Sequence, residues 1–207
     1  MKKFLLGVVV IIVVIVSICL ISITNKVLIL KKISTMADDL KNTNNYTAKI
    51  EEWTASSEES TEKNILSVTE IYYKDGKVKE KINDSIVWID YNANEGYAFD
   101  VNKKETNKLD LSDGYKVADK DTLATFRPII LTNNFGGYLK TAMTTKIKSE
   151  NEKYILTIDS SKYIINKENG LLELEATELS DGSTMYKSYE MHLDKVTDSD
   201  VECPSLN

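Results

Sequence analysis

YYKDGKVKEKI (residues 72–82) decides the fold class of this 207-residue chain. Its Asp75–Gly76 pair suits the tight turn of a β-hairpin, because that turn requires positive φ angles. After the turn, Val78, Glu80 and Ile82 alternate with lysines, which is the period of a strand whose two faces differ. The stretch therefore predicts two antiparallel strands joined by a two-residue turn.

The same two-residue period continues on both sides of this hairpin. The intervals between the apolar runs are too short for crossover helices, so the chain predicts an antiparallel meander rather than βαβ units. Further hairpins are expected around Asn151, around Asn169–Gly170 and at 180–183. The other predicted strands are YTAKIEEW (46–53), NILSVTEIYY (64–73), SIVWIDY (85–91), YAFDV (97–101), ETNKLDL (105–111) and TMYKSYEMHL (184–193).

Two segments have the helical rather than the strand period. Residues 25–42 place apolar side chains at helical spacing and predict a stalk helix. Residues 119–144 form a helical insert, which Pro128 and the Gly136–Gly137 pair are expected to divide into two short helices. Strands such as 85–91 are apolar on both faces and need cover, which these helices could provide on one side.

The N-terminal segment is apolar enough to cross a membrane. After a tail of residues 1–3, the run 4–24 has the length of a transmembrane helix and exceeds the core of a cleaved signal. A lipid anchor on Cys19 is the alternative, but bulky Ile18 precedes it where a small residue is required. Lysines flank both ends, so the positive-inside rule gives no orientation. We expect a single-pass signal anchor in the cell membrane, with residues 25–207 as an extracytoplasmic domain.

Composition argues against several classes of function. The net charge is −6 and no basic stripe occurs, which disfavours nucleic acid binding. Only Cys203 follows the apolar segment, so that domain has no internal disulfide and no cysteine-based metal site. The single histidine, His192, alternates with Met191 and Leu193 and has no accompanying nucleophile motif. We expect neither an enzyme nor a cofactor.

Three stretches carry a resemblance to a known family. They are YYKDGKVKEKI (72–82), YILTIDSSKYIINKENGLL (154–172) and SDGSTMYKSYEMHLDKVTDSDVECPSLN (180–207). Together with the order of elements over residues 28–205, they resemble the LolA/LolB-like superfamily, the lipoprotein-carrier fold that includes the sensor domain of RseB. The resemblance implies an α+β fold: an N-terminal helix and a curved antiparallel half-barrel of about eleven strands, with helices on its concave side. It also implies an apolar cavity suited to acyl chains.

Two hypotheses about function follow. The first is a membrane-anchored extracytoplasmic binding module that holds a lipid, a lipopeptide or a lipoprotein acyl chain. The alternative is an envelope sensory or scaffold domain that binds another protein and has no lipid ligand. Apolar and aromatic residues can line a ligand cavity or simply pack a β core. The candidate cavity and lid residues are Trp53, Val68, Trp88, Phe126, Ile129, Ile130, Phe135, Leu139, Leu156, Leu174 and Tyr189.

Overall fold

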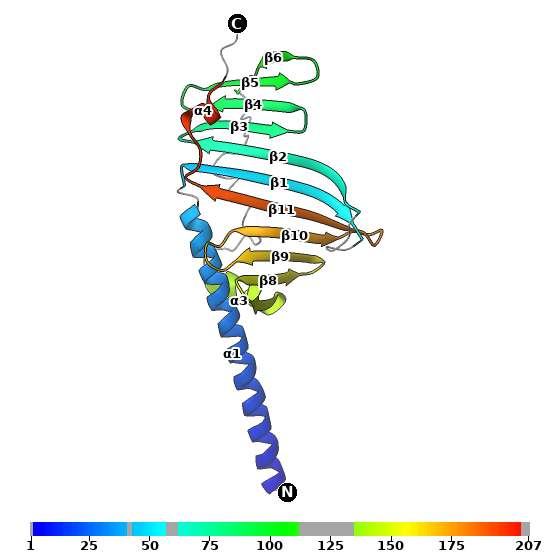
Figure 1. The fold of residues 1–207 in the computed structure, drawn as a ribbon. Helices are drawn as coiled ribbons and strands as arrows, with labels where there is room; N and C mark the ends of the chain where they lie inside the picture. The colour runs from blue at the N-terminus through cyan, green and yellow to red at the C-terminus, as the bar shows by residue number, and fades with distance from the viewer. Residues whose placement is uncertain (1, 41–42, 57–61, 112–134, 204–207) are drawn as a thin grey trace.

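The computed structural model describes residues 2–40, 43–56, 62–111 and 135–203. Within these ranges, one sheet of eleven antiparallel strands is accompanied by helices α1 (Lys2–Leu40), α3 (Phe135–Thr144) and α4 (Asp198–Val201) (Figure 1). The predicted α+β class, with an N-terminal helix and about eleven strands, is confirmed.

Neighbouring strands in the sheet are neighbours in the sequence, with one exception. The order is β6-β5-β4-β3-β2-β1-β11-β10-β9-β8-β7, so the β1–β11 pair joins the first half of the domain to the second. The strands are β1 (Asn45–Ala55), β2 (Asn64–Lys74), β3 (Lys77–Ile82), β4 (Ser85–Asp90), β5 (Glu95–Asp100), β6 (Glu105–Lys108), β7 (Lys146–Glu150), β8 (Lys153–Ile158), β9 (Ser161–Asn166), β10 (Leu172–Glu178) and β11 (Thr184–Leu193).

The hairpin between β2 and β3 forms where the sequence predicts it. Asp75 and Gly76 have φ angles of +48° and +84°, the left-handed conformation that this two-residue turn requires. A Cβ atom on Gly76 would lie 2.9 Å from the side-chain nitrogen of Asn92, so a larger residue would also crowd the neighbouring turn. Backbone conformation and space therefore both favour glycine at this position.

Helix α1 runs without a break from the apolar segment into the domain (Figure 1). Between Val10 and Met36 it is long and apolar enough to span a membrane, and its most apolar window is not buried against the domain. Nearer its C-terminal end, Leu30 and Ile33 are buried in the core. The apolar segment and the expected stalk helix are thus one continuous helix.

The face of the sheet that packs on Leu30 and Ile33 is called the α1 face here. It holds the main core cluster, to which Ala142 of α3 also contributes. The strand members of this cluster are Tyr46, Ala48, Ile71, Tyr73, Val78, Val87, Ile89, Tyr154, Leu156, Ile165, Leu172 and Tyr189.

The opposite face, called the α4 face, has its own buried residues. Trp53, Ala55, Ala176 and Tyr186 form a second cluster there, and the rings of Trp53 and Tyr186 stack with centroids 5.4 Å apart. Having two buried faces explains why strands such as β4 are apolar at successive positions.

Helix α3 corrects one expectation about the insert. Gly136 and Gly137 do not interrupt a helix, because α3 begins at Phe135 and includes both. Two glycines in the first helical turn are tolerated here because Tyr138 and Ala142 pack against the main core on the following turns. The first part of the expected insert, residues 119–134, lies outside the described residues.

Candidate functional site

Strands β10 and β11 are paired over only part of their length. Their register runs from Leu174 opposite Ser188 to Glu178 opposite Thr184. Strand β11 continues to Leu193 with β1 as its partner on the other side, whereas β10 leaves it. The cause is an irregularity in β10 between Leu172 and Leu174, because an extra residue in a strand bends it and ends the regular pairing. Figure 1 shows the two strands diverging toward α1.

A cavity of about 370 Å³ lies where the two strands separate. We call it the β10–β11 slot. Successive residues of β11 line it, as expected for a cavity against the edge of a strand rather than against its face. Its volume is within the range of ligand-binding pockets. The lining residues are Asn166, Asn169, Leu171, Glu173, Tyr189, Glu190 and Met191.

One wall of the slot is the turn between β9 and β10, which asparagine side chains hold in place. The Asn166 Oδ1 atom accepts hydrogen bonds from the backbone N–H groups of Glu168 (2.9 Å) and Asn169 (3.3 Å). The Asn169 Oδ1 atom accepts one from the N–H of Leu171 at 3.0 Å. Such bonds explain why asparagine suits this turn.

Helix α1 supports the same turn from outside. Gly170 has a φ angle of +73°, and a Cβ atom placed on it would lie 2.5 Å from the Cβ of Met36. The turn therefore approaches the helix as closely as glycine allows. This contact makes the wall of the slot part of the rigid core rather than a free loop.

The carboxylate of Glu173 lines the slot and is held in an ion pair. Burial by itself would raise the pKa of this carboxyl, but hydrogen bonds from Lys153 and Asn166 outweigh it and lower the pKa. The Lys153 Nζ lies 2.8 Å from Glu173 Oε2, and the Asn166 amide donates to Oε1 at 3.0 Å. Glu173 is thus ionised at neutral pH, and the exposed carboxylate of Glu190 lines the same slot.

Tyr189 remains protonated beside the slot. Burial and the neighbouring carboxylate of Glu175 both raise the pKa of its hydroxyl well above the ordinary value. The Tyr189 hydroxyl donates a hydrogen bond to Glu175 Oε2 at 3.4 Å. The lining thus combines carboxylates and amides with the apolar side chains of Leu171 and Met191.

The backbone of β11 adds hydrogen-bonding groups to the slot. In an antiparallel ladder, alternate residues direct their N–H and C=O groups to one neighbour and then to the other. Residues 190–193 pair with β1 on one side and lie beyond the last β10 partner on the other. Every second residue of this stretch therefore turns its backbone donor and acceptor toward the place where β10 is missing.

The described members of the expected cavity set lie on both faces of the sheet. Leu156 is fully buried on the α1 face, and Tyr189 is buried there as well. Trp53 and Leu174 belong to the second cluster on the α4 face. Val68 pairs with Glu51, so strand alternation places it on the Trp53 side of the sheet.

The remaining members are divided between α3, the α4 face and undescribed parts of the chain. Leu139 is half-buried on α3. Outside the described part of the chain lie Phe126, Ile129, Ile130 and the side chain of Phe135. Among the described members of the set, Tyr189 alone lines the slot. Reasoning from hydrophobicity missed the slot because most of its lining is polar.

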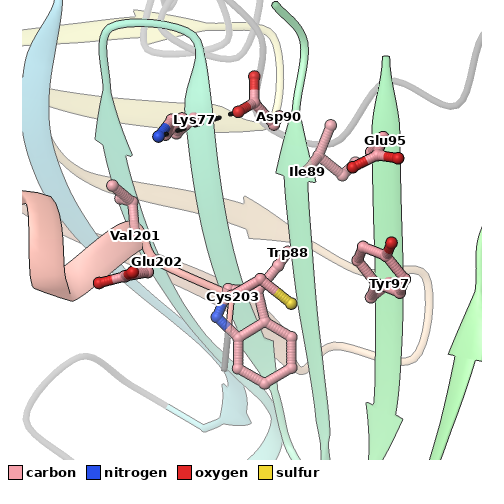
Figure 2. Close-up of a pocket in the computed structure, with 9 residues that line it drawn as sticks. All are labelled: Lys77, Trp88, Ile89, Asp90, Glu95, Tyr97, Val201, Glu202 and Cys203. Atoms are coloured by element: carbon pink, nitrogen blue, oxygen red, sulfur yellow. Dashed lines mark ion pairs between the residues drawn. The ribbon is translucent and has the colours of Figure 1, made fainter. Parts of the chain in front are cut away.

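Trp88 lies under the C-terminal helix instead of in a central cavity. It lines a pocket of about 140 Å³ together with Val201 of α4 and Cys203, as Figure 2 shows. Burial raises the pKa of the Cys203 thiol, and Glu95 adds to the effect, which makes the thiolate scarce at neutral pH. The pocket is smaller than typical ligand sites. We interpret it as the packing seam of α4.

Potential metal ligands are scattered over the described residues. No group of three or more His, Cys, Asp or Glu side chains in those ranges could hold a metal ion. His192 is exposed, and its Nε2 atom lies 3.1 Å from Glu190 Oε1.

Comparisons with known proteins concern the fold. No family model matches the chain, and no curated protein matches it in sequence. Among solved structures, it is similar to a LolA superfamily protein from Nitrosomonas europaea, with 10% identity, a TM-score of 0.33 and coverage of 84% of this chain and 97% of that one. It is also similar to the lipoprotein LppX from Mycobacterium tuberculosis, with 11% identity, a TM-score of 0.32 and coverage of 84% of this chain and 98% of that one.

The structure of the Pseudomonas aeruginosa MucA/MucB complex is also similar, with 11% identity, a TM-score of 0.39 and coverage of 84% of this chain and 60% of that chain. All three structures are less than 25% identical to this chain and have TM-scores below 0.5, so the likeness concerns the fold alone. The sheet of the chain itself, with eleven antiparallel strands and an N-terminal helix packed on one face, has the architecture that the sequence resemblance implies.

Proposed function

We propose that this protein is a membrane-anchored extracytoplasmic binding module. Its β10–β11 slot would bind an extended segment of another envelope protein, which would add a strand to the free edge of β11. The observation that carries the proposal is this edge at residues 190–193, next to a cavity of about 370 Å³. Strand addition uses the hydrogen bonds of the partner's backbone for affinity and side-chain pockets for specificity.

The lining of the slot fits a polypeptide. An extended chain presents both N–H and C=O groups, which match the free backbone groups of β11. The exposed carboxylate of Glu190 favours a segment with a basic side chain, and Leu171 and Met191 offer apolar contacts. An acyl chain has neither hydrogen-bond donors nor acceptors along its length, so it would leave the backbone groups of β11 that face the slot without partners.

A lipid or lipoprotein acyl chain on the α1 face, the first expectation from the sequence, stays a prediction. Burying each CH₂ group would contribute about 0.8 kcal/mol. However, Leu30 of α1 and Leu156 and Ile165 of the sheet are already fully buried where helix and strands meet. A lipid in that part of the face would have to displace the helix.

The test combines crosslinking with hydrogen exchange on the full-length protein. A photo-crosslinking amino acid at position 190 should capture one discrete protein in cells, whereas the same group at Ala93, in the exposed β4–β5 turn, should not. The purified partner should then slow amide exchange at those residues of 190–193 whose N–H groups face the slot. The proposal fails if the partner leaves these amides unprotected. A stoichiometric lipid in native mass spectra, with no protein captured at position 190, would support the lipid alternative.

A further inference from the structure

We propose that the end of the domain formed by α3 and β7 lies on the surface of the membrane that α1 spans, in contact with anionic lipid headgroups. This contact is separate from the β10–β11 slot and does not depend on the proposed partner. Figure 1 shows α3 at the end of the sheet that lies beside the middle of α1.

The first observation is that no linker separates the membrane segment from the domain. The apolar run of α1 ends at Ile23, and Ile23 itself already packs against the main core cluster. Val27, one turn further on, does the same. The domain therefore begins where the apolar run ends.

The second observation is a direct connection between α1 and the end of α3. The Nζ atom of Lys26 donates hydrogen bonds to the backbone oxygens of Thr145 (2.8 Å) and Ala142 (3.3 Å). A lysine is well placed there, because the last carbonyls of a helix lack partners and carry partial negative charge. The contact holds the α3–β7 junction at the level of Lys26 along α1.

That level can be compared with the dimensions of a bilayer. Residues 4–23 rise about 30 Å as a helix, which matches the hydrocarbon core. Lys26 is three residues further on and lies about 4.5 Å beyond the core along the axis. The headgroup region extends roughly 5–8 Å on each side of the core. The Lys26 contact with α3 therefore lies at headgroup depth.

The third observation is the surface chemistry of this end. Met143 is 68% exposed, the highest value among the large apolar side chains described. Lys140, Lys146 and Lys148 are exposed near it, and Glu150 is the single acidic residue in the sequence 135–150. Basic side chains next to a membrane segment attract anionic headgroups, and an apolar side chain among them can enter the interface.

The test measures how deep position 143 lies when the full-length protein is in vesicles. In a background with both cysteines, Cys19 and Cys203, replaced by serine, M143C is labelled with an environment-sensitive fluorophore. Nitroxide-labelled lipids should quench this fluorophore at least severalfold more than the same label on A93C, and its emission should shift to shorter wavelength. The vesicles contain phosphatidylglycerol or phosphatidylcholine alone.

A second set of variants tests the role of charge. Replacing Lys140, Lys146 and Lys148 with glutamate should reduce quenching at position 143 in phosphatidylglycerol vesicles. High salt should act in the same direction, because exposed charges are screened. Equal lipid quenching at positions 143 and 93 overturns the proposal. Two proteins are compared: labelled M143C with its native lysines and labelled M143C with the three glutamate substitutions. If lipid quenching is the same for both, in anionic and in neutral vesicles, the assignment of anionic headgroups is overturned.

Discussion

Replacing Leu30 with alanine tests whether α1 is part of the domain core or merely a tether. Leu30 is fully buried in the main cluster, so L30A removes its contacts and leaves a cavity between helix and sheet. Leucine-to-alanine changes at such sites cost about 2–5 kcal/mol of the free energy of unfolding. Leu28 is the matched control: it has the same chemistry two residues away, but is 59% exposed. L28A should change stability by less than about 0.5 kcal/mol.

The assay is urea unfolding of the full-length protein in detergent micelles, followed by the fluorescence of Trp53 and Trp88 in the sheet. With a urea dependence of about 2 kcal/mol per M, a loss of about 3 kcal/mol lowers the midpoint by about 1.5 M. Equal midpoints for L30A and L28A would show that the sheet folds without the helix, and the reasoning about α1 would be wrong. The same core contact predicts that a soluble fragment starting at residue 35 is less stable than one that keeps Leu30 and Ile33.

Two further predictions concern the turn against α1 and the charged end of the α1 face. Placing a residue with a Cβ atom in the left-handed conformation costs roughly 1–2 kcal/mol. G170A should lower the free energy of unfolding by more than this, because the new Cβ would also collide with Met36. G182A has a similar φ angle of +83° and nothing within 4 Å, so thermal unfolding of the two variants isolates the collision; equal losses would exclude it. The hydrogen bond from Lys187, whose Nζ is 2.6 Å from Glu52 Oε1, lowers the pKa of Glu52 despite its partial burial. Because the pKa of Glu52 is lower in the folded protein, its ionised carboxylate stabilises the fold at any pH above the ordinary glutamate pKa of about 4.3. This stabilisation is lost as the pH falls through the lowered pKa of the folded state. Stability of the wild type should therefore decline below about pH 4.3 more steeply than that of E52Q, by less than about 1 kcal/mol because the pair is partly exposed. Parallel pH profiles from denaturant titrations would show that the pair contributes nothing.

Much of the secondary structure follows from local pattern. The Asp75–Gly76 turn, the alternation in β3 and the glycine at position 170 all lie where short-range rules place them. The strand order on each side of the β1–β11 pair follows for the same reason, since strands that are neighbours in the sequence pair with each other. The helical spacing of residues 25–42 likewise predicts the end of α1, because a helix needs only local hydrogen bonds.

The faces of the strands are harder to predict than the strands themselves. Trp53 and Trp88 are as apolar as Leu156, yet strand alternation places both tryptophans on the α4 face. Both faces are partly covered, so hydrophobicity alone does not distinguish them. The irregularity between Leu172 and Leu174 also reverses which side of β10 faces the main core, and a one-residue shift of this kind has no clear signal in the sequence.

By itself, the sequence determined the apolar N-terminal helix, the antiparallel meander and the positions of its turns, since these depend on neighbouring residues. Only the tertiary structure decided the β1–β11 pairing, the slot that opens where β10 leaves β11, and the hydrogen bonds from Lys26 to the end of α3. Each of these brings together residues that are tens or more than a hundred positions apart. Their geometry depends on how the sheet bends and on where α1 packs across it, which local preferences do not specify.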